Sequence, residues 1–85
     1  MAEATRASVT VYVEGLDRTR VLAEIISSLN DEAVPIQSVR FETNKDRKFR
    51  STITFEISDT GHLFHILRQL NRVPGVYDVR RARTW

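Results

Sequence analysis

Residues 14–26 of the chain read Glu-Gly-Leu-Asp-Arg-Thr-Arg-Val-Leu-Ala-Glu-Ile-Ile, the pattern of a strand that turns directly into a helix. Before this stretch, valines alternate with polar residues from Val9 to Val13, which predicts a half-buried strand over about residues 8–14. After it, apolar residues recur at helical spacing and predict a helix over about residues 19–31. The helical stripe consists of Val21, Leu22, Ile25, Ile26 and Leu29.

The turn between this strand and this helix is a first candidate site. Gly15 is expected to take backbone angles that are closed to other residues, and Asp17 is expected to cap the helix. A loop that opens a helix directs backbone N–H groups at the space in front of it, which suits a small anionic ligand. The same loop also serves simply to turn the chain, so both interpretations stay open at this point.

Length and composition indicate one small globular domain. A chain of 85 residues buries roughly 60–65% of the surface that its unfolded form exposes, and hydrophobic and charged fractions of 41% and 28% are ordinary for such a domain. No apolar run approaches the roughly 18 residues of a membrane span. The chain has no cysteine, which is compatible with an intracellular origin. We expect a flexible tail over residues 1–7 and a single cytoplasmic domain over residues 8–85, without membrane contact or cofactor.

A turn and two strands follow the first helix. Pro35 cannot continue a helix, so the chain turns there before a strand over Ile36–Thr43, with Val39 and Phe41 on one face. Residues 44–47 have the composition of an exposed hairpin turn. The next strand has the clearest alternation in the sequence. Its expected core face carries Phe49, Ser51, Ile53, Phe55 and Ile57.

The last third of the chain predicts a helix and a final strand. Residues 58–60 offer N-cap candidates for a helix with an apolar stripe. That stripe consists of Leu63, Ile66, Leu67 and Leu70. Pro74-Gly75 marks a sharp turn, and the strand over residues 76–81 is expected to direct Tyr77 and Val79 inward.

The order β-α-β-β-α-β predicts a ferredoxin-like α+β fold, in which two helices cover one face of a four-stranded antiparallel sheet. The opposite face would carry threonine, arginine and glutamate side chains, with Tyr12 as its one aromatic residue. Water can wet such a face, so it needs no cover.

With these elements in place, the chain resembles an ACT domain, specifically the one that ends the long RelA/SpoT proteins. The resemblance covers about residues 8–81 and rests on Gly15-Leu16-Asp17-Arg18, on Val21-Leu22 with Ile25, and on the ending at residues 73–81. It implies a regulatory module of the stringent response without catalytic residues. The parent protein would be a GTP diphosphokinase and (p)ppGpp hydrolase whose two active sites lie upstream of this domain.

The resemblance also implies partners and a ligand site. ACT domains usually pair through sheet edges or helices, and many bind an amino acid where they pair, so we expect a homodimer. The candidate ligand-binding residues are Leu16, Asp17, Arg18, Thr19, Arg20, Val21 and, contributed across the dimer, Ile36. Ligand-binding members usually have glycine in place of Arg20 and an Asn-Ile pair in place of Pro35-Ile36. A long arginine there either plugs the pocket or clamps a carboxylate.

Two basic clusters form a second candidate site, for docking. The candidates are Lys45, Lys48, Arg50, Arg80 and Arg81. They suit phosphate contacts to ribosomal RNA or tRNA, a role that the RelA/SpoT resemblance also implies, although solvated loops explain them equally well. Here the domain would act without any small ligand.

Two rival functions are weaker. An RNA-recognition motif has the same element order and would stack a base on Tyr12, but its third strand carries two aromatic residues on the open face, where this chain has Arg50, Thr52 and Thr54. His62 and His65 lie one turn apart and would need a third metal ligand that the sequence does not offer. We therefore predict neither a metal site nor catalytic residues.

Overall fold

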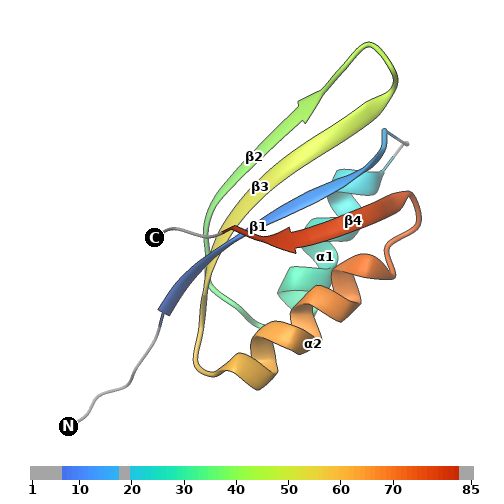
Figure 1. The fold of residues 1–85 in the computed structure, drawn as a ribbon. Coiled ribbons are helices and arrows are strands. Elements are labelled where there is room, and N and C mark those ends of the chain that lie inside the picture. The colour runs from blue at the N-terminus through green and yellow to red at the C-terminus, as the bar shows by residue number, and fades with distance from the viewer. Residues whose placement is uncertain (1–6, 18–19, 83–85) are drawn as a thin grey trace, which may run out of the picture.

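The computed structural model describes residues 7–17 and 20–82. Its elements are β1 (Ala7–Leu16), α1 (Val21–Asp31), β2 (Ile36–Thr43), β3 (Lys48–Ile57), α2 (Thr60–Asn71) and β4 (Val76–Arg81). The strands form one four-stranded antiparallel sheet in the order β2-β3-β1-β4, and both helices lie on the same side of it (Figure 1). The predicted ferredoxin-like α+β fold is confirmed.

The core lies between the helices and one face of the sheet. Alternate residues of the two central strands, β1 and β3, point toward the helices and form one cluster with the apolar stripes of α1 and α2. Its fully buried members include Val11, Val13, Ile25, Leu29, Ile53, Phe55, Ile66 and Leu70. Ser51 is a polar member of this layer, and its hydroxyl donates to the carbonyl oxygen of Arg40 at 3.0 Å, so it is buried without losing a hydrogen bond. The predicted core face of β3 is therefore confirmed.

Short-range polar contacts fix the ends of the elements. The Asp59 carboxylate accepts a hydrogen bond of 2.8 Å from the backbone N–H of His62, so α2 begins with an N-cap among the predicted residues. In the β2–β3 hairpin, the Asn44 side-chain oxygen accepts from the N–H groups of Asp46 and Lys48 at 2.9 and 3.2 Å. The turn expected at residues 44–47 is confirmed.

The inward face of β4 differs from the prediction. In the regular part of the pairing between β1 and β4, Val79 lies opposite Val13 and Asp78 lies opposite Glu14. The register then shifts by one residue, so that Gly15 lies opposite Val76 and not Tyr77. Tyr77 is the extra residue in this irregularity and is 54% exposed, whereas Val76 and Val79 pack against the core. The prediction that Tyr77 points inward is wrong, because a bulge interrupts the alternation on which it was based.

At one end and at one edge of the sheet, the structure differs in detail from the sequence-based expectation. Ala7, assigned to the tail from the sequence, is the first residue of β1, and the rest of that tail lies outside the described residues. Val39 and Phe41 share the helix-facing side of β2, but Val39 stays 39% exposed on this edge strand.

Among the described residues, no helix has both the length and the apolar character needed to cross a membrane.

Candidate functional site

The corner between β1 and α1 is closed by tight packing around Gly15. Gly15 is buried, and a Cβ atom there would overlap the Gly75 carbonyl oxygen and lie 2.8 Å from Cα of Val76. Among the glycines that the structure describes, Gly75 has the positive φ, at 99°. Gly15 is therefore required because the turn into β4 comes so close, and not for unusual backbone angles as the sequence suggested.

Two of the backbone amides predicted to face a ligand already have acceptors within the chain. The N–H of Leu16 donates to the Gly75 carbonyl oxygen at 2.8 Å, and the N–H of Asp17 donates to the Arg47 carbonyl oxygen at 2.7 Å. These bonds tie the corner to the turn before β4 and to the tip of the β2–β3 hairpin. A ligand at this corner would therefore have to use groups farther along the chain, toward Val21. Arg18 and Thr19, two of the predicted contacts, lie outside the described residues.

The first helix begins at an N-cap residue whose own side chain makes no capping hydrogen bond. This residue is Arg20, with φ at 77°. The prediction that Asp17 caps α1 is wrong, because the helix starts at Val21, too far along the chain for Asp17 to occupy the N-cap position. The exposed Arg20 thus holds a left-handed conformation that glycine adopts at less cost. This is the position at which ligand-binding ACT domains usually have glycine.

Ile36 lies at the opposite end of the sheet from this corner. It pairs with Phe55 of β3, which in turn pairs with Val9 near the beginning of β1. At ~3.3 Å per strand residue, Ile36 is on the order of 20 Å from the corner that follows Leu16. One copy of the chain therefore does not bring Ile36 together with the other predicted ligand contacts.

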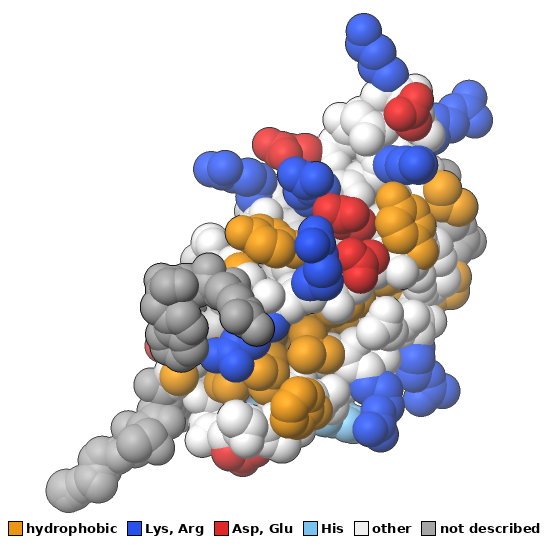
Figure 2. All heavy atoms as spheres, in the orientation of Figure 1, with side chains coloured by type: hydrophobic (Ala, Val, Ile, Leu, Met, Phe, Trp, Pro, Cys, Tyr) orange, Lys and Arg blue, Asp and Glu red, His pale blue; other side chains and the backbone are white. Residues whose placement is uncertain are grey.

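The basic docking candidates lie in three separate places. Lys45 and Lys48 are exposed at the tip of the β2–β3 hairpin. Arg50 and Arg80 lie on the open face of the sheet, the face opposite the helices. Arg81 pairs with the buried Val11, which places it on the helix-facing side of β4. Basic and acidic side chains lie interleaved in Figure 2, not as one basic patch.

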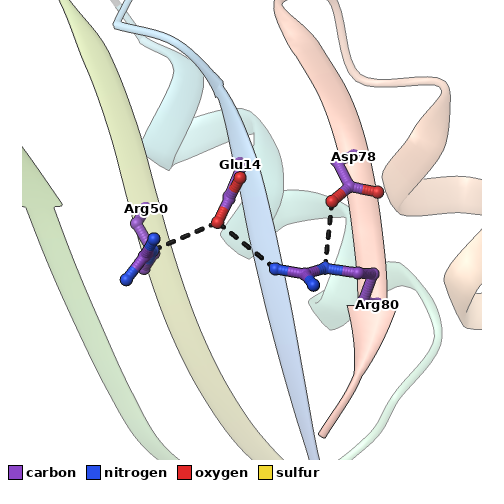
Figure 3. A network of polar contacts seen from close by, with 4 residues as sticks. All are labelled: Glu14, Arg50, Asp78 and Arg80. Carbon is purple, nitrogen blue, oxygen red and sulfur yellow. Dashed lines mark hydrogen bonds and ion pairs between the residues drawn. The ribbon is translucent and has the colours of Figure 1, made fainter.

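Glu14 joins two of these arginines on the open face (Figure 3). One of its carboxylate oxygens lies 3.1 Å from Nε of Arg50 and 3.5 Å from Nη2 of Arg80, and the Arg80 Nε also contacts Asp78 at 3.0 Å. The side chains of Arg50 and Arg80 are 65% and 60% exposed, whereas that of Glu14 is 20% exposed. Exposed ion pairs contribute about 0–1 kcal/mol each, so the main effect of this network is to orient the two guanidinium groups.

Arg40, Glu42 and Thr52, which were not among the candidate site residues, lie beside this network. Arg40, Thr52, Tyr12 and Arg80 are in register across the four strands, one from each. Together with Glu42 and Arg50 they line a hollow of about 400 Å³. In the sequence, Arg40 and Glu42 alternate with Val39 and Phe41, and this pattern is a signal that both belong to the polar face. Only the strand register, which the sequence does not display, shows which residues they adjoin.

The third strand lacks the stacking platform of an RNA-recognition motif. As predicted, Arg50, Thr52 and Thr54 alternate with the buried residues of β3 and lie on its open face. Thr54 contacts the hydroxyl of Thr10 across the strands at 2.9 Å. No aromatic side chain is present at these three positions for a base to stack on.

The two histidines on α2 meet an acid from the end of α1. Glu32, the C-cap residue of α1, contacts Nε2 of His65 at 2.9 Å and Nε2 of His62 at 3.6 Å. Among the described residues, no group of three or more histidine, cysteine or acidic side chains has an arrangement that could hold a metal ion. These contacts instead tie the end of α1 to the first turns of α2.

The family model for the ACT domain matches residues 3–81, which is nearly the whole chain. The chain belongs to the ACT domain family. The crystal structure of the ACT domain from GTP pyrophosphokinase of Chlorobium tepidum has the same fold, with a TM-score of 0.83 at 20% identity, covering 92% of this chain and 100% of that chain. The assignment agrees with the regulatory module expected from the sequence.

This ACT domain is also similar to segments of much longer bacterial proteins. It is 44% identical over 74 residues to a GTP pyrophosphokinase of Streptomyces coelicolor, covering 87% of this chain and 9% of that protein. It is 45% identical over 74 residues to the bifunctional (p)ppGpp synthase/hydrolase RelA of Mycobacterium tuberculosis, covering 87% of this chain and 10% of that protein. The chain thus spans about a tenth of the length of these relatives.

Proposed function

We propose that this ACT domain is the regulatory part of a RelA/SpoT-type (p)ppGpp synthetase/hydrolase of the stringent response. In this role it reports amino-acid or ribosome status to catalytic domains upstream. The observation that carries the proposal is the 44–47% identity to segments of GTP pyrophosphokinases over 87% of the chain. Identity at this level over a whole domain supports a shared role, whereas the fold alone would not.

We place an amino-acid site between two copies of the domain. Ile36 and the β1–α1 corner lie at opposite ends of the sheet, so only a second copy can bring them together. β2 is an edge strand whose outer side can pair with another strand. If the β2 strands of two copies pair antiparallel, Ile36 of one copy lies near the hairpin end of the other. That end adjoins the corner, because the Asp17 N–H donates to the Arg47 carbonyl oxygen.

Arg20 would hold the carboxylate of the amino acid. The guanidinium forms strong paired hydrogen bonds with carboxylates, and Arg20 is exposed where α1 begins. An amino acid bound to both copies favours one arrangement of the pair, and that bias would alter the balance between synthesis and hydrolysis upstream. For the signal to reach the catalytic domains, the amino acid must bind the two arrangements of the domain pair with different affinities. A ligand that binds both equally does not shift the equilibrium between them.

The test combines a mass measurement with ligand titration. Light scattering is expected to give the mass of a dimer, and leucine, isoleucine or valine is expected to shift the amide NMR signals of residues 16–21. Arg20→Gly suits the left-handed backbone and removes the whole side chain with its guanidinium, so binding is expected to weaken by about tenfold. Arg68→Ala, on the exposed side of α2, is the matched control.

Two results would contradict this site: a monomer with or without ligand, or unshifted signals at millimolar amino acid. Tighter binding by Arg20→Gly would contradict only the role of Arg20, because it would mean that the arginine plugs the pocket.

A second candidate function is docking to the ribosome without a small ligand. It is favoured by the engaged amides of Leu16 and Asp17 and by the exposed Lys45 and Lys48 at the hairpin tip. Phosphate contacts of this kind weaken as salt rises. Under this alternative, replacing both lysines with glutamate abolishes co-sedimentation with purified ribosomes, whereas Arg68→Glu leaves it intact. Unchanged co-sedimentation of the double variant would exclude docking through the hairpin tip.

A further inference from the structure

The open face of the sheet carries a hollow that neither proposed role uses. It has a volume of about 400 Å³ and is lined by Tyr12, Arg40, Glu42, Arg50, Thr52 and Arg80. Four of these residues form a straight row, because Arg40, Thr52, Tyr12 and Arg80 are in register across β2, β3, β1 and β4. The hollow is thus built by the rigid sheet and not by a loop, and its volume falls in the range of small-ligand sites.

The three arginines keep donors available for an anion. Arg50 contacts Glu14 through Nε, which leaves both of its terminal nitrogens for a ligand. Arg80 uses Nε for Asp78 and one terminal nitrogen for Glu14, which leaves the other. Within the described part of the chain, no ion pair engages the guanidinium of Arg40. Three guanidinium groups from three strands, two of which Glu14 orients, suit the oxygens of phosphate groups.

Tyr12 adds a planar apolar surface in the middle of the row. It is 37% exposed, with Thr52 beside it on β3 and Arg80 beside it on β4. A base can stack on a tyrosine ring of this kind while its phosphates reach the neighbouring arginines. The carboxylate of Glu42, also in the lining, can accept hydrogen bonds from the amino group of a base. The lining is thus basic overall, with one acid and three arginines.

We infer that this hollow binds a mononucleotide carrying two or more phosphates, with its base on Tyr12 and its phosphates at Arg40, Arg50 and Arg80. One ring in the row accommodates one base, and β3 offers no second aromatic residue beside it, so a single nucleotide fits better than a strand of RNA. The site lies on the open face, away from the β1–α1 corner. Its test therefore does not depend on the amino-acid site.

The experiment is an amide NMR titration of the 85-residue chain with GDP and GTP. The signals of Tyr12, Thr52 and Arg80 are expected to move, whereas those of Val21 and Ile36 stay in place. Arg40→Ala is expected to weaken binding by about tenfold, because it removes a charge-assisted contact without breaking a described ion pair. Tyr12→Leu is expected to weaken binding similarly and Tyr12→Phe to keep it. Arg68→Ala, on the helix side, is the control and keeps the affinity of the parent chain.

Three outcomes would overturn the inference. If inorganic pyrophosphate binds as tightly as GDP and Tyr12→Leu has no effect, the hollow holds only an anion and no base. If a short single-stranded RNA moves these signals and GDP does not, the face binds a strand. If none of the probes moves them while the spectrum of the chain remains that of a folded protein, the hollow is not a site.

Discussion

The two faces of the sheet are built from the same strands but have opposite physical character. On the helix side, Val11, Ile53 and Phe55 are fully buried and make contacts that depend on shape. On the open side, the half-buried Glu14 meets the exposed Arg50 in an ion pair. Burial of apolar side chains makes the helix side the main source of folding stability. The exposed side chains of the open side contribute little to stability and remain available for binding.

The comparison also separates two kinds of information in the sequence. Which residues share a face follows from alternation along one strand, so it is local. Which residues touch across strands depends on register, as in the contact between Glu14 and Arg50, which are 36 positions apart in the chain. Candidate sites that need such contacts were therefore recognised only in part.

The largest expected difference between the faces is in the stability lost when either of two neighbouring residues of β3 is replaced. Phe55→Ala is expected to lower the free energy of unfolding by about 3–5 kcal/mol, because it leaves a cavity in the core. Thr54→Ala, on the open face, removes the hydroxyl with its 2.9 Å contact to Thr10 together with one partly exposed methyl group, and it is expected to cost about 1 kcal/mol. Urea denaturation followed by circular dichroism measures both. Equal losses would contradict the division of the two faces.

A smaller loss of stability is expected from a substitution at Gly15, where β1 lies against the turn into β4. Gly15→Ala places a methyl group against the Gly75 carbonyl and is expected to cost about 1–3 kcal/mol. Gly61→Ala is the matched control in the first turn of α2, where the nearest atom to the new methyl group is the Asp59 carboxylate oxygen at 3.2 Å. It is expected to stay within about 1 kcal/mol of the parent chain in the same denaturation assay. A harmless Gly15→Ala would mean that the corner is loosely packed.

The smallest effect concerns the ion-pair network of the open face. Glu14→Gln removes the charge that Arg50 and Arg80 share, and it is expected to cost less than about 1 kcal/mol because both arginines are mostly exposed. The loss is expected to shrink further at high salt, where exposed charges are screened. Denaturation at low and high salt measures it. A loss above about 2 kcal/mol that is independent of salt would show that this face contributes to stability as a core does.

The fold was predictable because most of its elements show a regular period. The clear alternation from Phe49 to Ile57 gave the core face of β3 correctly, and the turn at residues 44–47 followed from its composition. Tyr77 was assigned to the wrong face because a bulge breaks the period of β4 without a sequence signal. The start of α1 was placed too early, since the left-handed Arg20 delays the helix to Val21.

The candidate sites were less predictable because they depend on contacts beyond one element. Hydrogen bonds from Leu16 and Asp17 engage carbonyls far along the chain, at Gly75 and Arg47, and no local pattern announces them. The row through Tyr12 and Arg40 likewise exists only once the register of the sheet is set. Local patterns gave the residue types of these sites, and tertiary pairing determined their neighbours.

The most direct test of the proposed regulatory site uses isotope-labelled leucine bound to the domain. Within one copy, Ile36 lies on the order of 20 Å along the strands from the β1–α1 corner, which Val21 follows as the first residue of α1, so one leucine molecule is not expected to contact both residues. A site shared between two copies predicts nuclear Overhauser effects from bound leucine to Ile36 and to the amide of Val21 in the same sample. Effects to one of the two residues, or to neither, at saturating leucine would contradict a site built across the dimer.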